Sequence, residues 1–211
     1  MSSDLPSDAP SRVPESAPSG DVGERLRVRG EPLLEALDRH LPGAREHADS
    51  TATYAFAAAA ELGLDRGRCE RAREAVRLHE VGLVYVRPSV LAKPAEKRGR
   101  RERKEFDANY EAGYRLARGA GVPEEACDWL LRMRENFDGS GPEGLAGEAI
   151  PIESRLMRAT CTFHAAVAEP APGSDAPPHV RGAARIKAQA GGELDPDVVQ
   201  ALVAVVERAA M

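Results

Sequence analysis

The residues with the clearest chemical potential are the adjacent His79 and Glu80, in the stretch L-H-E-V-G-L at residues 78–83. An apolar segment brings an imidazole and a carboxylate side by side, and a glycine follows two residues later. Imidazole nitrogens and carboxylate oxygens are common ligands of zinc and other divalent ions. The pair predicts either a metal site at a helix end or, as the simpler alternative, a histidine whose ring is satisfied by a backbone carbonyl group.

The elements that must position this pair are predicted to be helices, because apolar residues recur at helical spacing through most of the chain. Loops are indicated by V-G-L-V-Y-V-R-P, by D-G-S-G-P-E-G and by the Pro/Gly/Ser/Asp-rich stretch 169–178. No stretch alternates long enough to predict a sheet, so the expected fold class is all-α. The predicted helices run from Pro32 to His40, over 47–62, 66–82, 104–119, 123–135, 150–168 and 181–190, and from about Asp195 to the end.

Composition supports a helical protein and limits its partners. The 211 residues are rich in alanine and only 4% aromatic, which favours closely packed helices. The formal net charge is −5, and the one basic run, residues 96–105, lacks interleaved aromatic side chains, so we expect no DNA binding. No apolar stretch is long enough to span a membrane. Three widely spaced cysteines indicate reduced thiols, and the expected location is the cytoplasm.

The two ends of the chain differ in character. Residues 1–22 are rich in Ser, Pro, Asp and Ala and offer almost nothing to bury. Such a segment cannot offset the entropy lost on ordering, so we predict a disordered tail. We predict that residues 23–211 form a single helical domain.

Further motifs follow the His-Glu pair in order. They read V-R-P-S-V-L-A-K-P, N-Y-E-A-G, R-E-N-F-D-G-S-G-P-E-G-L-A-G, I-P-I-E-S-R-L-M-R-A-T-C-T-F-H-A and G-G-E-L-D-P-D-V-V. This series, over about residues 33–208, resembles the HD-GYP family within the HD superfamily of metal-dependent phosphohydrolases. The resemblance implies a helical bundle, and a family activity of cyclic di-GMP hydrolysis with two or three metal ions in the bundle core.

Carried over residue by residue, the resemblance defines a set of site positions. These are His47, His79, Glu80, Asn109, Met133, Arg134, Glu135 and Cys161, with Asp138, Gly139, Ser140 and Gly141 in the following loop. The family has metal-binding histidines where this chain has Asn109, Met133 and Arg134, and an aspartate where it has Cys161. Leu83 replaces a lysine, and His164 replaces a second acid. The tyrosine of the G-Y-P motif is missing.

These departures predict the loss of a binuclear centre. A two-metal hydrolase holds its ions about 3.5–4 Å apart and needs several anionic or imidazole ligands for each. A thioether suits hard cations poorly, and a guanidinium adds a permanent positive charge. We therefore expect a catalytically degenerate domain without a metal cofactor. We also predict that Arg134 forms a buried ion pair with Glu80 or Glu135 where relatives hold metal.

A single-ion site is the alternative. His47, His79, Glu80 and Cys161 would be its ligands, and the ion would be zinc, iron or manganese. The competing interpretation is that these side chains pack as ordinary core groups. We expect His164 to pack or cap rather than to react.

Three functions remain open from the sequence. The first is a signalling or scaffolding module that binds a protein partner, such as a GGDEF-type diguanylate cyclase domain, which the resemblance associates with the Asp138–Gly141 loop. The second is a metal-dependent phosphohydrolase, acting on cyclic di-GMP or another phosphoester with an altered, mononuclear site. The third is a sensor that binds a cyclic dinucleotide without cleaving it.

Overall fold

The computed structural model describes residues 19–169, 173 and 175–210, and these residues are helical almost throughout. No named strand occurs among them, which confirms the predicted all-α bundle. The α-helices are α1 (Ser19–His40), α2 (Ala44–Glu61), α3 (Arg66–Arg77), α4 (Pro88–Leu91), α5 (Arg100–Asp107), α6 (Asn109–Gly119), α7 (Glu124–Arg132), α8 (Ile152–Ala168), α9 (Pro178–Gln189) and α10 (Pro196–Ala209). Short 3₁₀ turns are η1 (Val81–Tyr85), η2 (Ala95–Lys97) and η3 (Gly147–Ala149).

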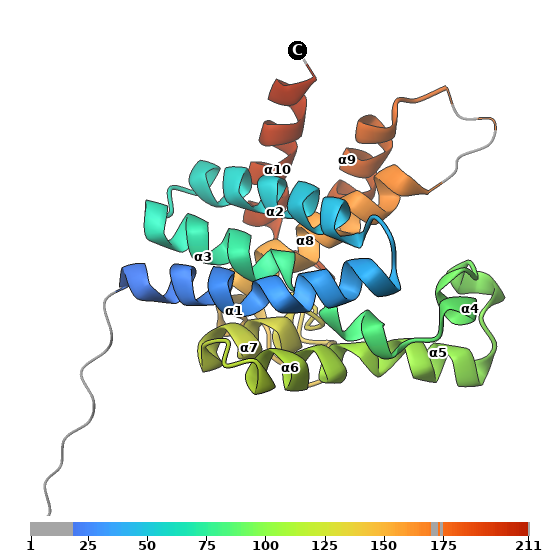
Figure 1. Cartoon of the computed structure of the whole chain (residues 1–211). Helices are drawn as coiled ribbons and strands as arrows, with labels where there is room; N and C mark the ends of the chain where they lie inside the picture. Colours follow the sequence, from blue (N-terminus) through green and yellow to red (C-terminus); the bar gives the residue numbers. More distant parts are fainter. Residues whose placement is uncertain (1–18, 170–172, 174, 211) are drawn as a thin grey trace, which may run out of the picture.

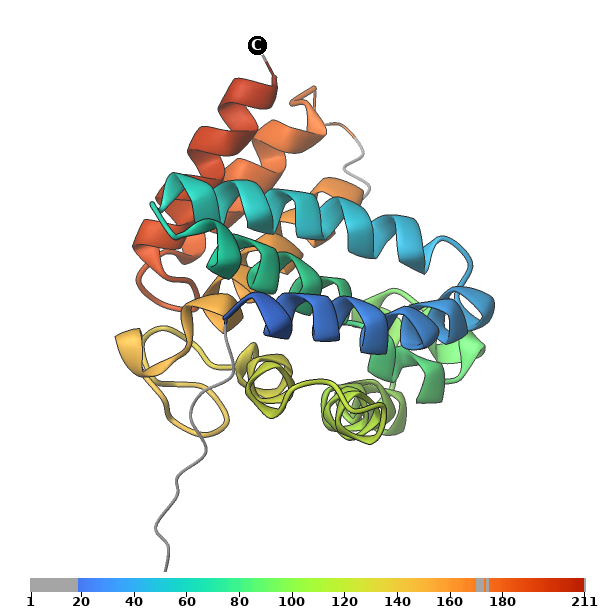
Figure 2. The same cartoon turned by 60° about the vertical axis from the view of Figure 1, so that its left-hand side comes forward.

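The helices form a bundle in which α2, α3 and α1 lie in succession, with α3 between the other two (Figure 1). Turned by 60°, the molecule shows α6 and α7 beneath α1 (Figure 2). Helix α8 packs against α2, α3 and α7 on the inner side, and α9 and α10 pack on its outer end. The middle of α8 therefore faces the junction of α2 and α3.

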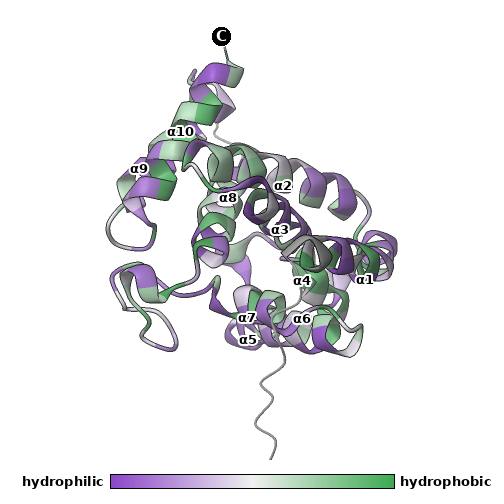
Figure 3. Cartoon of the chain, turned by 90° about the vertical axis from the view of Figure 1, so that its left-hand side faces the viewer, coloured by the Kyte–Doolittle hydropathy of each residue, from purple (hydrophilic) through white to green (hydrophobic). Residues whose placement is uncertain are grey.

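Small side chains allow α2 to lie close to its neighbours. Its buried positions are nearly all alanine: Ala44, Ala48, Thr51, Ala52, Ala55, Ala58 and Ala59. Large apolar side chains from α8 and α10 complete this part of the core, among them Leu156, Phe163 and Leu202. Figure 3 shows hydrophilic residues along much of α1, α3 and α5 and a more apolar α8 and α10. Burial of one face of most of these helices holds the bundle together, whereas α5 has no fully buried residue.

Helix α1 is longer than predicted. The sequence predicts a start at Pro32, but the helix already begins at Ser19 and carries Pro32 in its interior. A buried stripe of Leu26, Leu34 and Leu37 explains the extension, because its packing offsets the hydrogen bond lost at the proline. Residues 19–22, assigned to the disordered tail, are thus helical, and the rest of that predicted tail lies outside the described residues.

Two other predicted helices end early or divide. The helix predicted over 66–82 ends at Arg77 as α3, and residues 78–80 form a turn that leads into η1. The helix predicted over 104–119 is two helices, α5 and α6, which join at Ala108. The start of the last helix is confirmed, because the Asp195 side chain caps α10 by accepting from the Asp197 N–H at 2.9 Å. No described helix has the combination of length and apolar character that crossing a bilayer requires.

Candidate metal and ligand site

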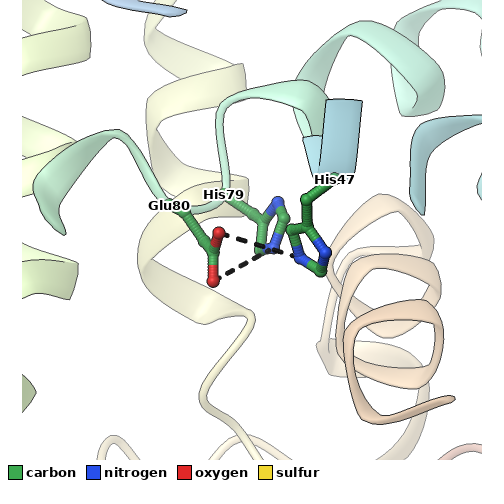
Figure 4. A group of neighbouring side chains, drawn as sticks. All are labelled: His47, His79 and Glu80. Atoms are coloured by element: carbon green, nitrogen blue, oxygen red, sulfur yellow. Dashed lines mark ion pairs between the residues drawn. The ribbon is translucent and has the colours of Figure 1, made fainter. Parts of the chain in front are cut away.

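Two elements bring three potential metal ligands together. Helix α2 carries His47, and the turn after α3 carries His79 and Glu80. The His47 Nε2 atom lies 3.7 Å from Glu80 Oε2, and His79 Nε2 lies 3.9 Å from Glu80 Oε1. Figure 4 shows the carboxylate and the two rings pointing toward one another. One ligand atom from each residue falls within 4.8 Å of the other two, which suits a single ion with two imidazoles and one carboxylate.

The environment of His79 prepares its ring for this role. Its Nδ1 atom lies 2.8 Å from the backbone oxygen of Val76, so Nδ1–H donates to that carbonyl. The lone pair is then on Nε2, the nitrogen that faces Glu80. Burial lowers the pKa of His79, against the opposing effect of the nearby Glu80 charge. A neutral, oriented imidazole is the form that binds metal, so the residues present fit one divalent ion. The alternative prediction was that a backbone carbonyl group satisfies the His79 ring, and the structure shows this bond as well. The bond from Nδ1 to Val76 is therefore compatible with both predictions.

A third histidine borders the cluster. The His164 ring packs edge-on against His47, with ring centroids 5.1 Å apart, and its Nε2 lies 3.1 Å from the Ser50 hydroxyl oxygen. Burial, assisted by the neighbouring histidines, lowers its pKa to about 4. The prediction that His164 packs rather than reacts is consistent with these contacts.

A cavity of about 380 Å³ opens beside the three ligands. Its lining residues are His47, His79, Glu80, Leu83, Phe106, Asn109, Tyr110, Met133, Arg158, Cys161, Thr162 and Ala165. Six of the eight site positions carried over from the resemblance thus meet in one place. Arg134 and Glu135 do not line this cavity.

The rest of the lining is poor in ligands for a second ion. The Asn109 side-chain amide donates to the backbone oxygen of Phe106, and Met133 is almost fully buried. Burial raises the pKa of the Cys161 thiol well above its usual value, and the Glu80 charge raises it further. A neutral thiol is a weak ligand unless a metal displaces its proton. Cys161 also lies outside the group of three converging ligands.

Arg134 does not form the predicted buried ion pair. Its guanidinium lies over the Tyr110 ring, 4.8 Å from the centroid, in a cation–π contact. No ion pair within 4.0 Å joins it to Glu80 or Glu135, both of which the structure describes. The prediction is wrong because Arg134 follows the end of α7, where the chain has left helical geometry and turns the side chain toward α6.

Glu135 instead organises the loop that follows it. Its carboxylate accepts hydrogen bonds from the backbone N–H groups of Glu143, at 2.8 Å, and Leu145, at 3.0 Å. Within that loop the Asp138 side chain accepts from the Ser140 N–H at 2.9 Å. The Asp138 N–H donates to the backbone oxygen of Gly192. Hydrogen bonds therefore hold the loop to Glu135 at its base and to Gly192 in the turn before α10.

Two residues that border the site, Tyr110 and Arg158, were not predicted from the sequence, and neither was the contact between His164 and His47. Arg158 was detectable in principle, since it lies three residues before Cys161 on one helix and so shares its face. Arg155, six residues before Cys161, lies on another face of the same helix and pairs with Asp195.

The fold and the site together define an α-helical bundle with a His/His-Glu metal-type centre. A family model described as HD domain matches residues 32–198, and the chain belongs to this family. The cyclic di-GMP phosphodiesterase response regulator RpfG of Xanthomonas campestris pv. campestris (strain 8004) is 30% identical over 190 residues, which are 89% of this chain and 50% of that protein. The chain thus spans about half the length of this curated relative.

Solved structures show the same fold. Bd1817, an HDG"Y"P protein from Bdellovibrio bacteriovorus, superposes with a TM-score of 0.64 at 14% identity and covers 90% of this chain and 61% of that chain. The HD domain of the L. monocytogenes phosphodiesterase PgpH, in complex with cyclic-di-AMP, gives a TM-score of 0.60 at 15% identity, over 84% of this chain and 97% of that chain. These structures share the fold, and the family-model match over residues 32–198 confirms the predicted membership of the HD superfamily.

Proposed function

We propose that this chain is a degenerate HD-GYP-like signalling module that binds a cyclic dinucleotide, holds no more than one divalent ion and does not hydrolyse its ligand. The proposal rests mainly on which side chains line the cavity. His47, His79 and Glu80 converge there, while Asn109, Met133 and Cys161 offer only an amide, a thioether and a neutral thiol. The choice of ligand rests on the similar proteins, which are named as cyclic di-GMP phosphodiesterases or bind cyclic-di-AMP.

We expect no hydrolysis because the reaction of this family requires two metal ions. Two-metal hydrolysis needs both cations to activate a bridging hydroxide and to neutralise the leaving oxygen. Asn109 and Met133 supply no charge to hold a second cation, and Leu83 supplies no group to stabilise an anion. Cyclic dinucleotide binding needs none of this chemistry, because phosphate recognition requires only positioned donors and positive charge.

A mononuclear phosphohydrolase is the second candidate function. The hydrogen bond from His79 Nδ1 to Val76 supports it, because this bond orients Nε2 as a metal ligand. Zinc, iron or manganese would be the ion, and it would supply Lewis-acid activation of a phosphoryl oxygen or of water. Cys161 lines the same cavity, but it would have to approach the three ligands and lose its proton to become a fourth ligand.

Elemental analysis with a ligand-binding assay separates these candidates. We expect about one ion per chain in protein purified without chelator, and its loss in His79→Ala. His179→Ala, on α9 and outside the cavity, is the matched control and keeps the ion. Calorimetry with cyclic di-GMP is expected to show binding, and chromatography of the incubated nucleotide is expected to show no product. Two ions per chain, or turnover that His79→Ala abolishes, would contradict the proposal in favour of an enzyme.

The same proposal includes a protein partner, such as a GGDEF-type domain, in the cytoplasm. The loop at Asp138–Gly141 supports it, because Asp138 and Ser140 are exposed and because hydrogen bonds to Gly192 and Glu135 hold the loop in a defined shape. Asp138→Ala removes the bond to the Ser140 N–H and is expected to weaken binding of a purified GGDEF domain in surface plasmon resonance. Equal affinity for parent and variant would exclude this loop as the contact.

A further inference from the structure

The cavity beside the three ligands carries a second charged group that faces it from α8. Arg158 lies three residues before Cys161, and both line the cavity. Glu80 is the one carboxylate in that lining. No ion pair within 4.0 Å joins Arg158 to Glu80, although the structure describes both side chains. The cavity therefore has an acidic side, with His47 and His79, and a separate cationic side.

The Arg158 guanidinium is held in place from outside the cavity. Its Nη2 donates to Asn136 Oδ1 at 2.9 Å and to Glu193 Oε2 at 3.0 Å. These acceptors come from the segment after α7 and from the turn before α10. The Arg158 side chain is only 26% exposed. A long side chain fixed in this way loses little conformational entropy when it binds a ligand.

The same guanidinium keeps donors free. Its Nε atom is buried and has no hydrogen-bond partner among the described residues. A buried donor without an acceptor is unfavourable, so a shift of the side chain that brought Nε to a ligand oxygen would be stabilising. The guanidinium can donate to a phosphate oxygen, and it remains positively charged at any physiological pH. Among the described residues that line the cavity, Arg158 is the one arginine or lysine, so it is the side chain there that would attract an anion.

We propose that Arg158 is the phosphoryl-binding residue of this cavity and holds anionic oxygens of the ligand opposite the His47–His79–Glu80 cluster. The inference rests on the proposed function for the identity of the full ligand, a cyclic dinucleotide. The chemistry that Arg158 recognises is the phosphoryl group itself, which inorganic phosphate shares. Arg158 thereby supplies positive charge that a second metal ion would supply in a binuclear site.

The test compares Arg158→Gln and Arg158→Lys with the parent chain in calorimetric titrations. Each protein is titrated with cyclic di-GMP, with inorganic phosphate and, separately, with Mn²⁺. Arg132→Gln is the matched control, since it removes the same charge from α7 outside the cavity. Thermal melts of all variants verify that each is folded.

We expect Arg158→Gln to weaken cyclic di-GMP binding at least tenfold and to leave the Mn²⁺ stoichiometry unchanged. Arg158→Lys keeps the charge but not the planar guanidinium, and its affinity for cyclic di-GMP is expected to lie between those of the parent and Arg158→Gln. Arg132→Gln is expected to stay within twofold of the parent. Equal cyclic di-GMP affinity in parent and Arg158→Gln would overturn the role of Arg158 and leave the proposed function standing.

The phosphate titration separates the remaining outcomes. If the parent binds inorganic phosphate but not cyclic di-GMP, and Arg158→Gln loses phosphate, then Arg158 keeps its role and the proposed dinucleotide ligand is wrong. Phosphate binding that survives in Arg158→Gln would reject Arg158. A parent chain that binds neither probe would reject both proposals.

Discussion

At the scale of the residue, the ionisation of the histidines decides what the site can hold. Burial is the main cause of the lowered pKa of both His79 and His164. Their rings are therefore neutral near pH 7, and a neutral ring keeps a nitrogen lone pair for a metal ion. The hydrogen bond to Val76 decides which nitrogen of His79 carries that lone pair.

The lowered pKa values predict a pH dependence of stability in the metal-free chain. In the unfolded chain each histidine takes up a proton as pH falls below about 6.5, whereas the folded chain resists protonation until pH approaches about 4 at His164. Unfolding then takes up protons, so the free energy of unfolding decreases as pH falls through this window, by at most about 1.4 kcal/mol per pH unit for each proton.

Urea unfolding in EDTA at pH 7.5, 6.5 and 5.5 measures this slope. His164→Gln removes one of the two groups and is expected to flatten the dependence. An identical slope in parent and variant would show that His164 titrates normally in the folded chain.

At the scale of the element, the approach of η1 to α6 sets the turn that carries His79 and Glu80. Gly82 lies in η1, and a Cβ there would come within 1.8 Å of the Asn109 backbone oxygen. The obstacle is backbone, which cannot move aside as a flexible side chain could. Gly82 is therefore needed for the position of the metal-type ligands and not only for the turn.

Gly82→Ala is expected to lower the free energy of unfolding by about 3 kcal/mol or more, since overpacking against a rigid neighbour forces the backbone apart. Gly119→Ala is the control at the far end of α6, where a Cβ meets nothing within 4 Å. That substitution is expected to be neutral or to stabilise by up to about 1 kcal/mol. Urea denaturation measures both, and a mild effect of Gly82→Ala would contradict the close approach.

At the scale of the whole molecule, a buried ion pair connects the site helix to the last helix. Arg155 on α8 pairs with Asp195, which is 4% exposed and also caps α10. Arg155 Nε additionally donates to the Ile150 backbone oxygen at 2.9 Å. The start of α10 is thus fixed to the helix that supplies Arg158 and Cys161.

Asp195→Ala is expected to lower the free energy of unfolding by about 3–5 kcal/mol, because it leaves the Arg155 charge partly buried and unpaired and removes a helix cap. Glu61→Gln breaks the exposed pair with Arg208 and is the control, with an expected midpoint close to the parent. Chemical denaturation compares the three proteins. A small loss in Asp195→Ala would show that α10 docks mainly through its apolar face.

Much of the fold was predictable because alanine-rich helical patterns and loop residues mark most boundaries. The early start of α1 was missed, since charged residues and Pro32 obscure the stripe of Leu26, Leu34 and Leu37. Periodicity also does not show that α5 and α6 divide at Ala108.

The order of motifs in the sequence predicted which residues form the site, but not the direction in which every side chain points. His47, His79 and Glu80 meet as expected. Arg134 was misplaced because it follows the end of α7, where helical periodicity no longer gives the direction of a side chain. Arg158 was not predicted, although its spacing from Cys161 places both residues on one face of α8, and the packing of α8 turns that face toward the cavity.

Anomalous diffraction from crystals grown with excess Mn²⁺ tests most directly whether this site holds a single ion. We expect one anomalous peak per chain, bound by His47, His79 and Glu80. Two peaks about 3.5–4 Å apart, with an oxygen bridging them, would contradict it and restore a binuclear hydrolytic centre.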